Sequence, residues 1–269
     1  MTNLSQVQGR EASPWSAVTG LASREVVSFL RQRSRVIASL ATPIMFWLMF
    51  GAGFGSSFRG AGAAESNFLE YFFPGILILA VVFAGIFSTI STIQDRQEGF
   101  LQSVLVAPIP RWAIVSGKIL GGSLLAFLQG AVLLALGPLA GIPFHVLGFA
   151  LALVWLFLIS VGMTALGFYF AWKIDSVQGF HGVMNTLLMP MWLLSGAFFP
   201  AAGAYWVIKA LMTINPLTYG LVGLRRALYM GTPEKLVGLP SSWVCLAVVL
   251  GMILLMIGAS ASAVRKKAL

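Results

Sequence analysis

Residues that could do chemistry are scarce in this sequence. Its 269 positions hold eight acidic residues, two histidines and a single cysteine, Cys245. The long uncharged stretches contain no acidic residue, so paired carboxylates for acid–base or metal-assisted reactions are not expected inside them. His145 and His181 lie in two different uncharged stretches and are expected at opposite ends of the fold, so they cannot share a metal ion. We therefore predict no catalytic residue, no metal site and no enzymatic activity.

Gly117 and Lys118 resemble the end of a nucleotide-binding loop. Such a loop has another Gly upstream and a Ser or Thr directly after the Lys. Here Trp112 occupies the upstream position and Ile119 follows Lys118. We therefore expect this chain to bind no ATP and no other cofactor itself.

The composition indicates a membrane protein. Apolar residues make up 58% of the chain and charged residues 9%, whereas soluble domains carry about 25% charged residues. A run of about 20 apolar residues crosses a bilayer as a helix. The longest uncharged run, 119–172, is interrupted by Gly141 and Pro143, so it holds two spans. We predict an all-α fold with one transmembrane domain, 36–264. Its six transmembrane helices are expected near 36–55, 72–93, 114–140, 148–172, 178–199 and 243–263.

The distribution of charge predicts the topology. Most of the 17 Lys and Arg residues flank the predicted spans on the side that holds both termini. Because basic flanks stay in the cytoplasm, we expect a multi-pass protein of the bacterial inner membrane with both termini inside. This topology accounts for the net charge of +9, so no nucleic acid partner is expected. Residues 1–16 are expected to form a disordered cytoplasmic tail, and residues 265–269 a second cytoplasmic tail.

Residues 17–35 have the pattern of an amphipathic helix. One side of the helical wheel carries Val18, Ala22, Val26, Phe29 and Leu30. The other side carries Arg24, Ser28, Arg31 and Arg35, while Arg33 falls on the apolar side. Such a helix lies in the membrane interface, with its arginines toward lipid headgroups. The alternative is a simple anchor that stops the first span at the cytoplasmic surface.

The segment 200–232 predicts a helical hairpin on the outer face. Its uncharged stretch is too short to cross the membrane, and a seventh span would place the basic C-terminus outside. Asn215 and Pro216 supply a turn between two arms. Arg225 would then lie at the level of the outer headgroups.

Polar uncharged residues inside the spans have two interpretations. Ser88, Thr92 and Asn185 could line a path for an amphiphilic substrate, or could form hydrogen bonds between helices. Three Gly pairs with GxxxG spacing, including Gly117 and Gly121, permit close helix packing. Ion-coupled transporters usually carry ionisable residues in the membrane interior, and none is expected there in this chain. The energy for transport would therefore come from a partner that hydrolyses nucleotide.

The loop 94–112 contains a short helical pattern. Phe100, Leu101, Val104 and Leu105 recur at helical spacing, and Pro108 and Pro110 end the pattern. A short apolar helix between charged flanks suits a groove on a soluble partner. The alternative is a connector that lies on the membrane.

Two groups of residues resemble a known family. Glu98-Gly99, Leu105, Pro108 and Arg111, followed by Gly117-Lys118, resemble the cytoplasmic loop of ABC-2-type permeases, the membrane subunits of drug-resistance, polysaccharide and lipo-oligosaccharide exporters. The segment from Leu194 to Pro200, then Asn215-Pro216-Leu217-Thr218-Tyr219, Leu224-Arg225 and Gly231, is similar to the outer segment of that family. The run Asp95-Arg96-Gln97-Glu98 departs from the family pattern, which is more acidic and has an arginine just after the glutamates.

The resemblance implies a helical permease that works as a dimer, with a second copy or a paralogous permease, on two ABC ATP-binding subunits. ATP and Mg²⁺ would be bound by those subunits. The implied ATPase-coupling residues are Glu98, Gly99, Phe100, Leu101, Leu105, Pro108 and Arg111, with the N-terminal helix beside them. Spans 2 and 5 would flank the substrate path, and the hairpin would close its outer mouth.

These features predict an ATP-driven export permease for an amphiphilic substrate, such as a lipid, a glycolipid or polysaccharide, or a drug. Two alternatives stay open. A secondary transporter or channel would work from an ion gradient without an ATPase. A membrane scaffold would move no substrate.

Overall fold

The computed structural model describes residues 13–31, 33–59, 68–106 and 109–266, and every regular element in these ranges is helical. Most of the expected N-terminal tail, part of the first outer loop, Pro108 and the end of the C-terminal tail lie outside the described residues. The described part of the chain therefore confirms the all-α prediction.

Four helices are long and apolar enough to cross a membrane: Phe68–Gln97, Arg111–Leu134, Val146–Lys173 and Ser242–Arg265. They match four of the six predicted spans. Two bent helix pairs also qualify if each pair counts as one span. The first of these is Pro14–Arg31 with Val36–Gly51, and the second is Trp206–Ile214 with Pro216–Leu228. The described residues thus hold four to six candidate spans.

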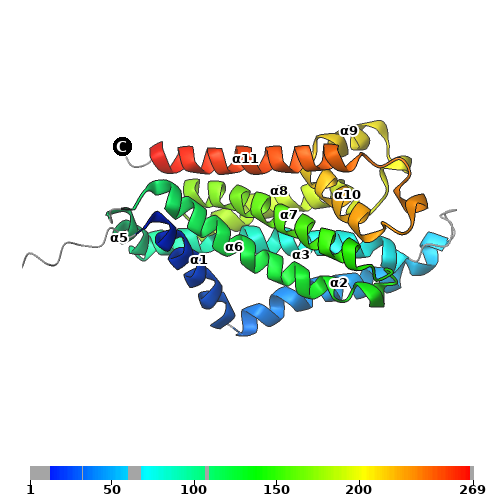
Figure 1. The fold of residues 1–269 in the computed structure, drawn as a ribbon, viewed down its shortest axis with the longest axis horizontal. Helices are drawn as coiled ribbons and strands as arrows, with labels where there is room; N and C mark the ends of the chain where they lie inside the picture. The colour runs from blue at the N-terminus through cyan, green and yellow to red at the C-terminus, as the bar shows by residue number, and fades with distance from the viewer. Residues whose placement is uncertain (1–12, 32, 60–67, 107–108, 267–269) are drawn as a thin grey trace, which may run out of the picture.

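The chain forms an elongated bundle with two distinct ends (Figure 1). Helices α3 (Phe68–Ser88), α6 (Arg111–Leu134), α7 (Val146–Lys173) and α11 (Ser242–Lys266) run along its length. One end holds α1 (Pro14–Arg31), α5 (Phe100–Val106) and the end of α11. The opposite end holds α9 (Trp206–Ile214) and α10 (Pro216–Leu228). The remaining helices are α2 (Arg33–Arg59), α4 (Ile90–Gln97) and α8 (Val177–Trp192).

Glycines bring α3 and α7 into direct contact in the core. A Cβ atom added at Gly167 would lie 2.9 Å from the Cα atom of Ile86. One added at Gly85 would lie 2.8 Å from the Oγ1 atom of Thr164. A side chain at either position would therefore force these helices apart.

The N-terminal segment differs from the single helix expected over 17–35. Helix α1 ends at Arg31, and α2 begins at Arg33, with a bend of 74° between Pro14–Arg31 and Val36–Gly51. Arg33 and Arg35 therefore belong to α2, and the side chain of Arg35 lies outside the described part of the chain. This bend separates the apolar face of α1 from that of α2.

Helix α1 packs on α6 at the predicted glycine pair. A Cβ atom at Gly117 would lie 2.9 Å from the Leu21 Cβ atom, and one at Gly121 would lie 3.0 Å from the Ala22 carbonyl oxygen. Close packing at this GxxxG pair is thereby confirmed.

Two predicted helix ends need correction. Helix α6 ends at Leu134 and a separate 3-10 turn covers Gly137–Ala140, because Pro138 cannot donate a helical hydrogen bond. Gly141 then adopts a left-handed φ of 89°, which ends the turn. Helix α8 continues into a π-helical turn, Leu193–Ala197, in which Gly196 has a φ of 86°.

Candidate functional site

The predicted coupling loop folds into a turn and a short helix. Helix α4 ends at Gln97, Glu98 caps it, and Gly99 takes a left-handed φ of 79° that favours glycine. Helix α5 follows as Phe100–Val106. Pro110 is extended and leads directly into α6 at Arg111.

Helix α5 is attached to the bundle by one face. Leu101 is buried in a small apolar cluster with Ile114 and Phe168. Val106, at the end of α5, is 86% exposed. The side chain of Leu105 is outside the described part of the chain. The helix thus keeps a free surface at the end of the bundle.

Four charged residues gather beside α5: Arg24, Glu25, Asp95 and Lys118. We call them the ion cluster. Both guanidinium nitrogens of Arg24 donate to the Asp95 carboxylate, with Nη2–Oδ1 and Nη1–Oδ2 distances of 2.8 and 3.0 Å. The Lys118 ammonium donates to Glu25 Oε1 at 2.5 Å and also to Asp95 Oδ2. Two positive and two negative charges therefore balance each other.

The ion cluster is buried unevenly. The side chain of Lys118 is 2% exposed, and those of Glu25 and Asp95 are also buried. The side chain of Arg24 is 42% exposed. Burial of this kind is tolerated because every charge has a partner of opposite sign.

Sequence reasoning missed the ion cluster, although one signal was present. Glu25 lies between Val18, Ala22 and Phe29 on the apolar side of the helical wheel. An acidic residue on an apolar face indicates a buried partner. Arg24 was assigned to the lipid-facing side, but its guanidinium binds Asp95. Asp95, rather than Glu98, is the acidic residue of this loop that holds an arginine.

Two further contacts tie the loop to its surroundings. The Arg24 guanidinium lies 3.9 Å from the ring centroid of Phe100, a cation–π contact between α1 and α5. Arg96 donates to the carbonyl oxygens of Trp172 and Ile174, at 2.9 and 2.5 Å. The segment before α5 is therefore fixed to both α1 and the end of α7. Arg111 donates to the Arg265 carbonyl oxygen at 3.4 Å.

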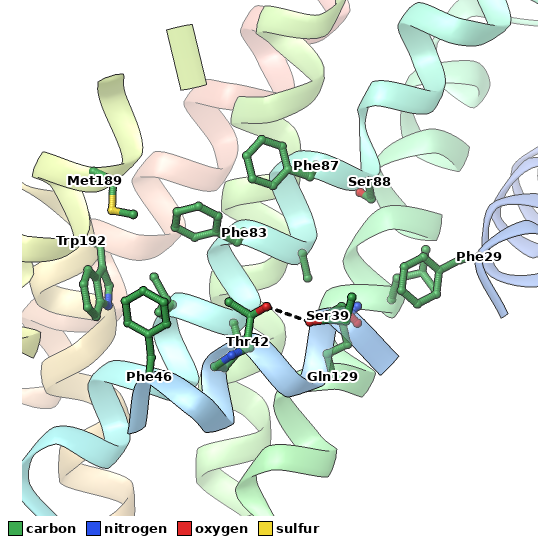
Figure 2. Close-up of a pocket in the computed structure, with 16 residues that line it drawn as sticks. Phe29, Ser39, Thr42, Phe46, Phe83, Phe87, Ser88, Gln129, Met189 and Trp192 are labelled. Atoms are coloured by element: carbon green, nitrogen blue, oxygen red, sulfur yellow. Dashed lines mark hydrogen bonds between the residues drawn. The ribbon is translucent and has the colours of Figure 1, made fainter. Parts of the chain in front are cut away.

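A cavity of about 360 Å³ opens between α1, α2, α3, α6 and α8. The aromatic rings of Phe46, Phe83, Phe87 and Trp192 surround one side of it, and Phe29 of α1 lies on the other (Figure 2). Its polar groups come from Ser39, Thr42, Ser88 and Gln129. None of the described residues that line it is charged. This volume and lining suit the uncharged part of an organic ligand.

The three residues of the predicted substrate path have different surroundings. Ser88 lines the cavity and its hydroxyl donates to the Gly85 carbonyl oxygen at 2.7 Å. Thr92 is buried, and its hydroxyl finds no hydrogen-bond partner among the described residues. Asn185 is exposed on α8.

The predicted turn at Asn215 and Pro216 is present. Helices α9 and α10 meet there at 82°. The Asn215 side-chain oxygen accepts from the Leu217 backbone amide at 3.0 Å. The Asn215 side-chain nitrogen donates to the Met191 carbonyl oxygen at 2.6 Å. Pro216 takes the first helical position, where its missing N–H costs nothing.

Arg225 binds backbone rather than standing free at the surface. Its guanidinium donates to the Gly196 carbonyl oxygen at 3.0 Å and lies 4.3 Å from the ring centroid of Tyr71. The Tyr71 hydroxyl donates to the same carbonyl at 3.1 Å. The π-helical turn thus provides an acceptor that joins α3 to α10.

The described residues contain no group of three or more His, Cys, Asp and Glu side chains that could hold a metal ion. The four members of the ion cluster neutralise one another. The arrangement offers a short, partly exposed helix, a buried charge cluster and an uncharged cavity.

Comparison with known proteins gives consistent matches. The family model described as ABC-2 type transporter matches residues 16–229. The putative transport permease ycf38 of Cyanophora paradoxa is 28% identical over 209 residues, 76% of this chain and 71% of its own length. The inner membrane transport permease YadH of Escherichia coli (strain K12) is 23% identical over 220 residues, covering 78% and 82%. The daunorubicin resistance ABC transporter permease protein DrrB1 of Streptomyces coeruleorubidus is 24% identical over 214 residues, covering 77% and 72%.

Proposed function

We propose, from the premise that this chain belongs to the ABC-2 type transporter family, that it exports an amphiphilic substrate with energy supplied by a partner ATPase. Members of this family normally work with separate ATP-binding subunits. The observation that carries the proposal is α5, a short helix held by Leu101 at one end of the bundle with a free surface beyond it.

The free surface of α5 fits a groove on a soluble subunit. Phe100 is held under Arg24 and Leu101 is buried, so the helix is fixed in place before any partner binds. A helix that is already ordered loses little conformational entropy on docking. Two ATP-binding subunits would dock on two such helices, one from each permease of a dimer. The second permease is a further copy of this chain or a paralogous one.

Docking is tested by a charge placed on α5. Val106 is 86% exposed, and Val237, at the other end of the molecule, is 83% exposed. Tagged Val106→Asp, Val237→Asp and unaltered protein would be purified from native membranes in mild detergent. We expect Val106→Asp to lose the copurifying ATP-binding subunit, while Val237→Asp retains it. Equal recovery from both variants would refute docking on α5. An unaltered protein that brings down no ATP-binding subunit would refute the proposed ATPase partner.

The proposed topology has six spans, formed by α2, α3 with α4, α6, α7, α8 and α11. Both termini and α5 would lie in the cytoplasm of a bacterial inner-membrane protein. Arg111 and Arg265 meet at the α5 end, as the preference of basic residues for the cytoplasmic side requires. Helix α1 would lie at the inner interface. The segment 200–232 would form the re-entrant hairpin that closes the outer mouth.

The cavity supports an amphiphilic substrate. Aromatic rings and the absence of charge favour an apolar or aromatic group, and the hydroxyls of Thr42 and Ser88 add weak polarity. The name of the relative DrrB1 refers to daunorubicin resistance, which agrees with export of an aromatic compound. The class of substrate is an organic molecule with an uncharged apolar part, such as a lipid, a glycolipid or a drug.

Filling the cavity tests this proposal. Ala84 lines the cavity and is half-buried. The variant Ala84→Trp is expected to reduce export of a fluorescent amphiphilic drug from inverted vesicles and to leave ATPase binding intact. Export at the unaltered rate would mean that the cavity does not hold the substrate.

The ion cluster suggests an alternative, because ionisable residues inside the membrane often mark proton or sodium pathways. A secondary transporter would show flux in liposomes under an ion gradient without any ATPase. The mutual pairing of all four charges favours the ATP-driven proposal, since no carboxylate is left unpaired to carry an ion.

A further inference from the structure

We propose that the ion cluster makes α1 move together with α5, so that α1 transmits the motion of a docked ATPase to the helix bundle. Asp95 is the central residue in this inference, and Arg24 joins it to α1. The inference rests on the proposed function, since it assumes that a partner displaces α5.

The ion cluster joins three separate parts of the chain. Arg24 and Glu25 come from α1, Asp95 from α4 and Lys118 from α6. Asp95 is the member that lies on the segment leading directly into α5. Both Arg24 and Lys118 bind its carboxylate. A displacement of α4 and α5 therefore acts on α1 through Arg24 and on α6 through Lys118.

The two cations that bind Asp95 differ in how exposed they are to solvent. Lys118 is 2% exposed, and Glu25 would lose its short ion pair if Lys118 moved away. Arg24 is 42% exposed, so its guanidinium can exchange Asp95 for water at a much smaller cost. The Phe100 ring lies 3.9 Å below the same guanidinium. The same guanidinium therefore ties α1 to α5 through Phe100 and to α4 through Asp95.

The contact between α1 and α6 is close at two glycines. At Gly117 and Gly121, α6 presents backbone rather than side chains to α1, within about 3 Å of where a Cβ atom would lie. Leu21 and Glu25 of α1 therefore pack directly on the backbone of α6. The register of α1 on α6 is then set by the ion pair between Glu25 and Lys118. A buried polar group that fixes register is a well-supported role for such clusters.

The first test measures positioning in the permease alone. Spin labels would be placed at Ser23 on α1 and Ser103 on α5, both exposed, in a Cys245→Ser background in lipid nanodiscs. We expect a narrow distance distribution that broadens in Asp95→Asn. The matched control is Lys235→Met, which removes a partly exposed ion pair with Glu70 at the other end of the molecule. An unchanged distribution in Asp95→Asn would overturn the inference.

The second test measures transmission with the ATPase bound. The variant Arg24→Met, Glu25→Leu, Asp95→Leu and Lys118→Met replaces the ion cluster by apolar side chains, so it leaves no unpaired charge. We expect it to bind the ATPase and to export at least about fivefold less substrate per ATP hydrolysed, the lower end of typical coupling effects. Wild-type export per ATP would overturn the inference. Loss of ATPase binding in the unaltered protein would instead refute the proposed function, which the label experiment does not use.

Discussion

Removal of the Lys118 ammonium is expected to destabilise the folded protein strongly. In Lys118→Met, Asp95 keeps both hydrogen bonds from Arg24, whereas Glu25 is left with an Arg24 nitrogen 4.0 Å away. The cluster then carries one excess negative charge in a buried position. Loss of one partner from a buried ion pair costs about 3–5 kcal/mol. For a chain of this size that corresponds to a fall in Tm of roughly 6–20 °C.

The assay is thermal unfolding of the purified protein in one detergent, followed by intrinsic Trp fluorescence. The double variant Glu25→Gln with Lys118→Met restores charge balance, so it should be more stable than Lys118→Met alone. Coupled neighbours typically differ from additivity by about 0.5–3 kcal/mol. Lys235→Met serves as the control, because exposed pairs contribute about 0–1 kcal/mol. A Lys118→Met protein as stable as the control would refute the view that this cluster is buried and mutually dependent.

Two further predictions concern packing and a hydroxyl. Gly121→Leu should push α1 from α6, because its Cβ would lie 2.8 Å from the Glu25 Cβ atom. A loss of about 1–3 kcal/mol and faster hydrogen exchange in α1 are expected, whereas Gly20→Leu, with no atom within 4 Å of its added Cβ, should exchange normally. Burial, aided by Glu70, raises the pKa of the Tyr229 hydroxyl, which donates to the Glu70 carbonyl oxygen at 3.0 Å. Its stabilisation is full below the ordinary tyrosine pKa of about 10 and falls as the pH rises above it. Tyr229→Phe should therefore cost about 0.5–1.5 kcal/mol and flatten stability between about pH 9 and 12. If the Tm of Tyr229→Phe falls with pH in this range as steeply as that of the unaltered protein, Tyr229 does not titrate in this way.

The helices were predictable where composition alone decides them. Uncharged runs identify α3, α6, α7 and α11, because a long apolar helix has few other stable environments. Local backbone chemistry gave further details. Asn215 and Pro216 form the predicted turn, and Gly117 with Gly121 forms a close helix contact. These signals lie within a few residues of one another, so a single sequence contains them.

The ion cluster was not predictable in the same way. Arg24 and Asp95 are 71 positions apart, and Glu25 and Lys118 are 93 apart. Their pairing depends on the direction of α1, which the bend near Arg31 sets relative to α2. No local pattern specifies that direction. The cavity has the same origin, since Phe29, Phe83 and Trp192 come from three distant helices. The sequence likewise did not indicate that Lys118 and Asp95 are buried together and paired.

The glycine contacts between α3 and α7 have a mechanical consequence. Because backbone and threonine hydroxyl atoms meet directly at Gly85 and Gly167, that interface has little space to compress or rearrange. These helices should behave as one stiff beam through a transport cycle. Opening would then be confined to seams filled by flexible side chains, such as the one where Phe46 of α2 and Met189 of α8 face the cavity. The glycine contacts would thereby keep α3 and α7 fixed relative to each other while other helices move.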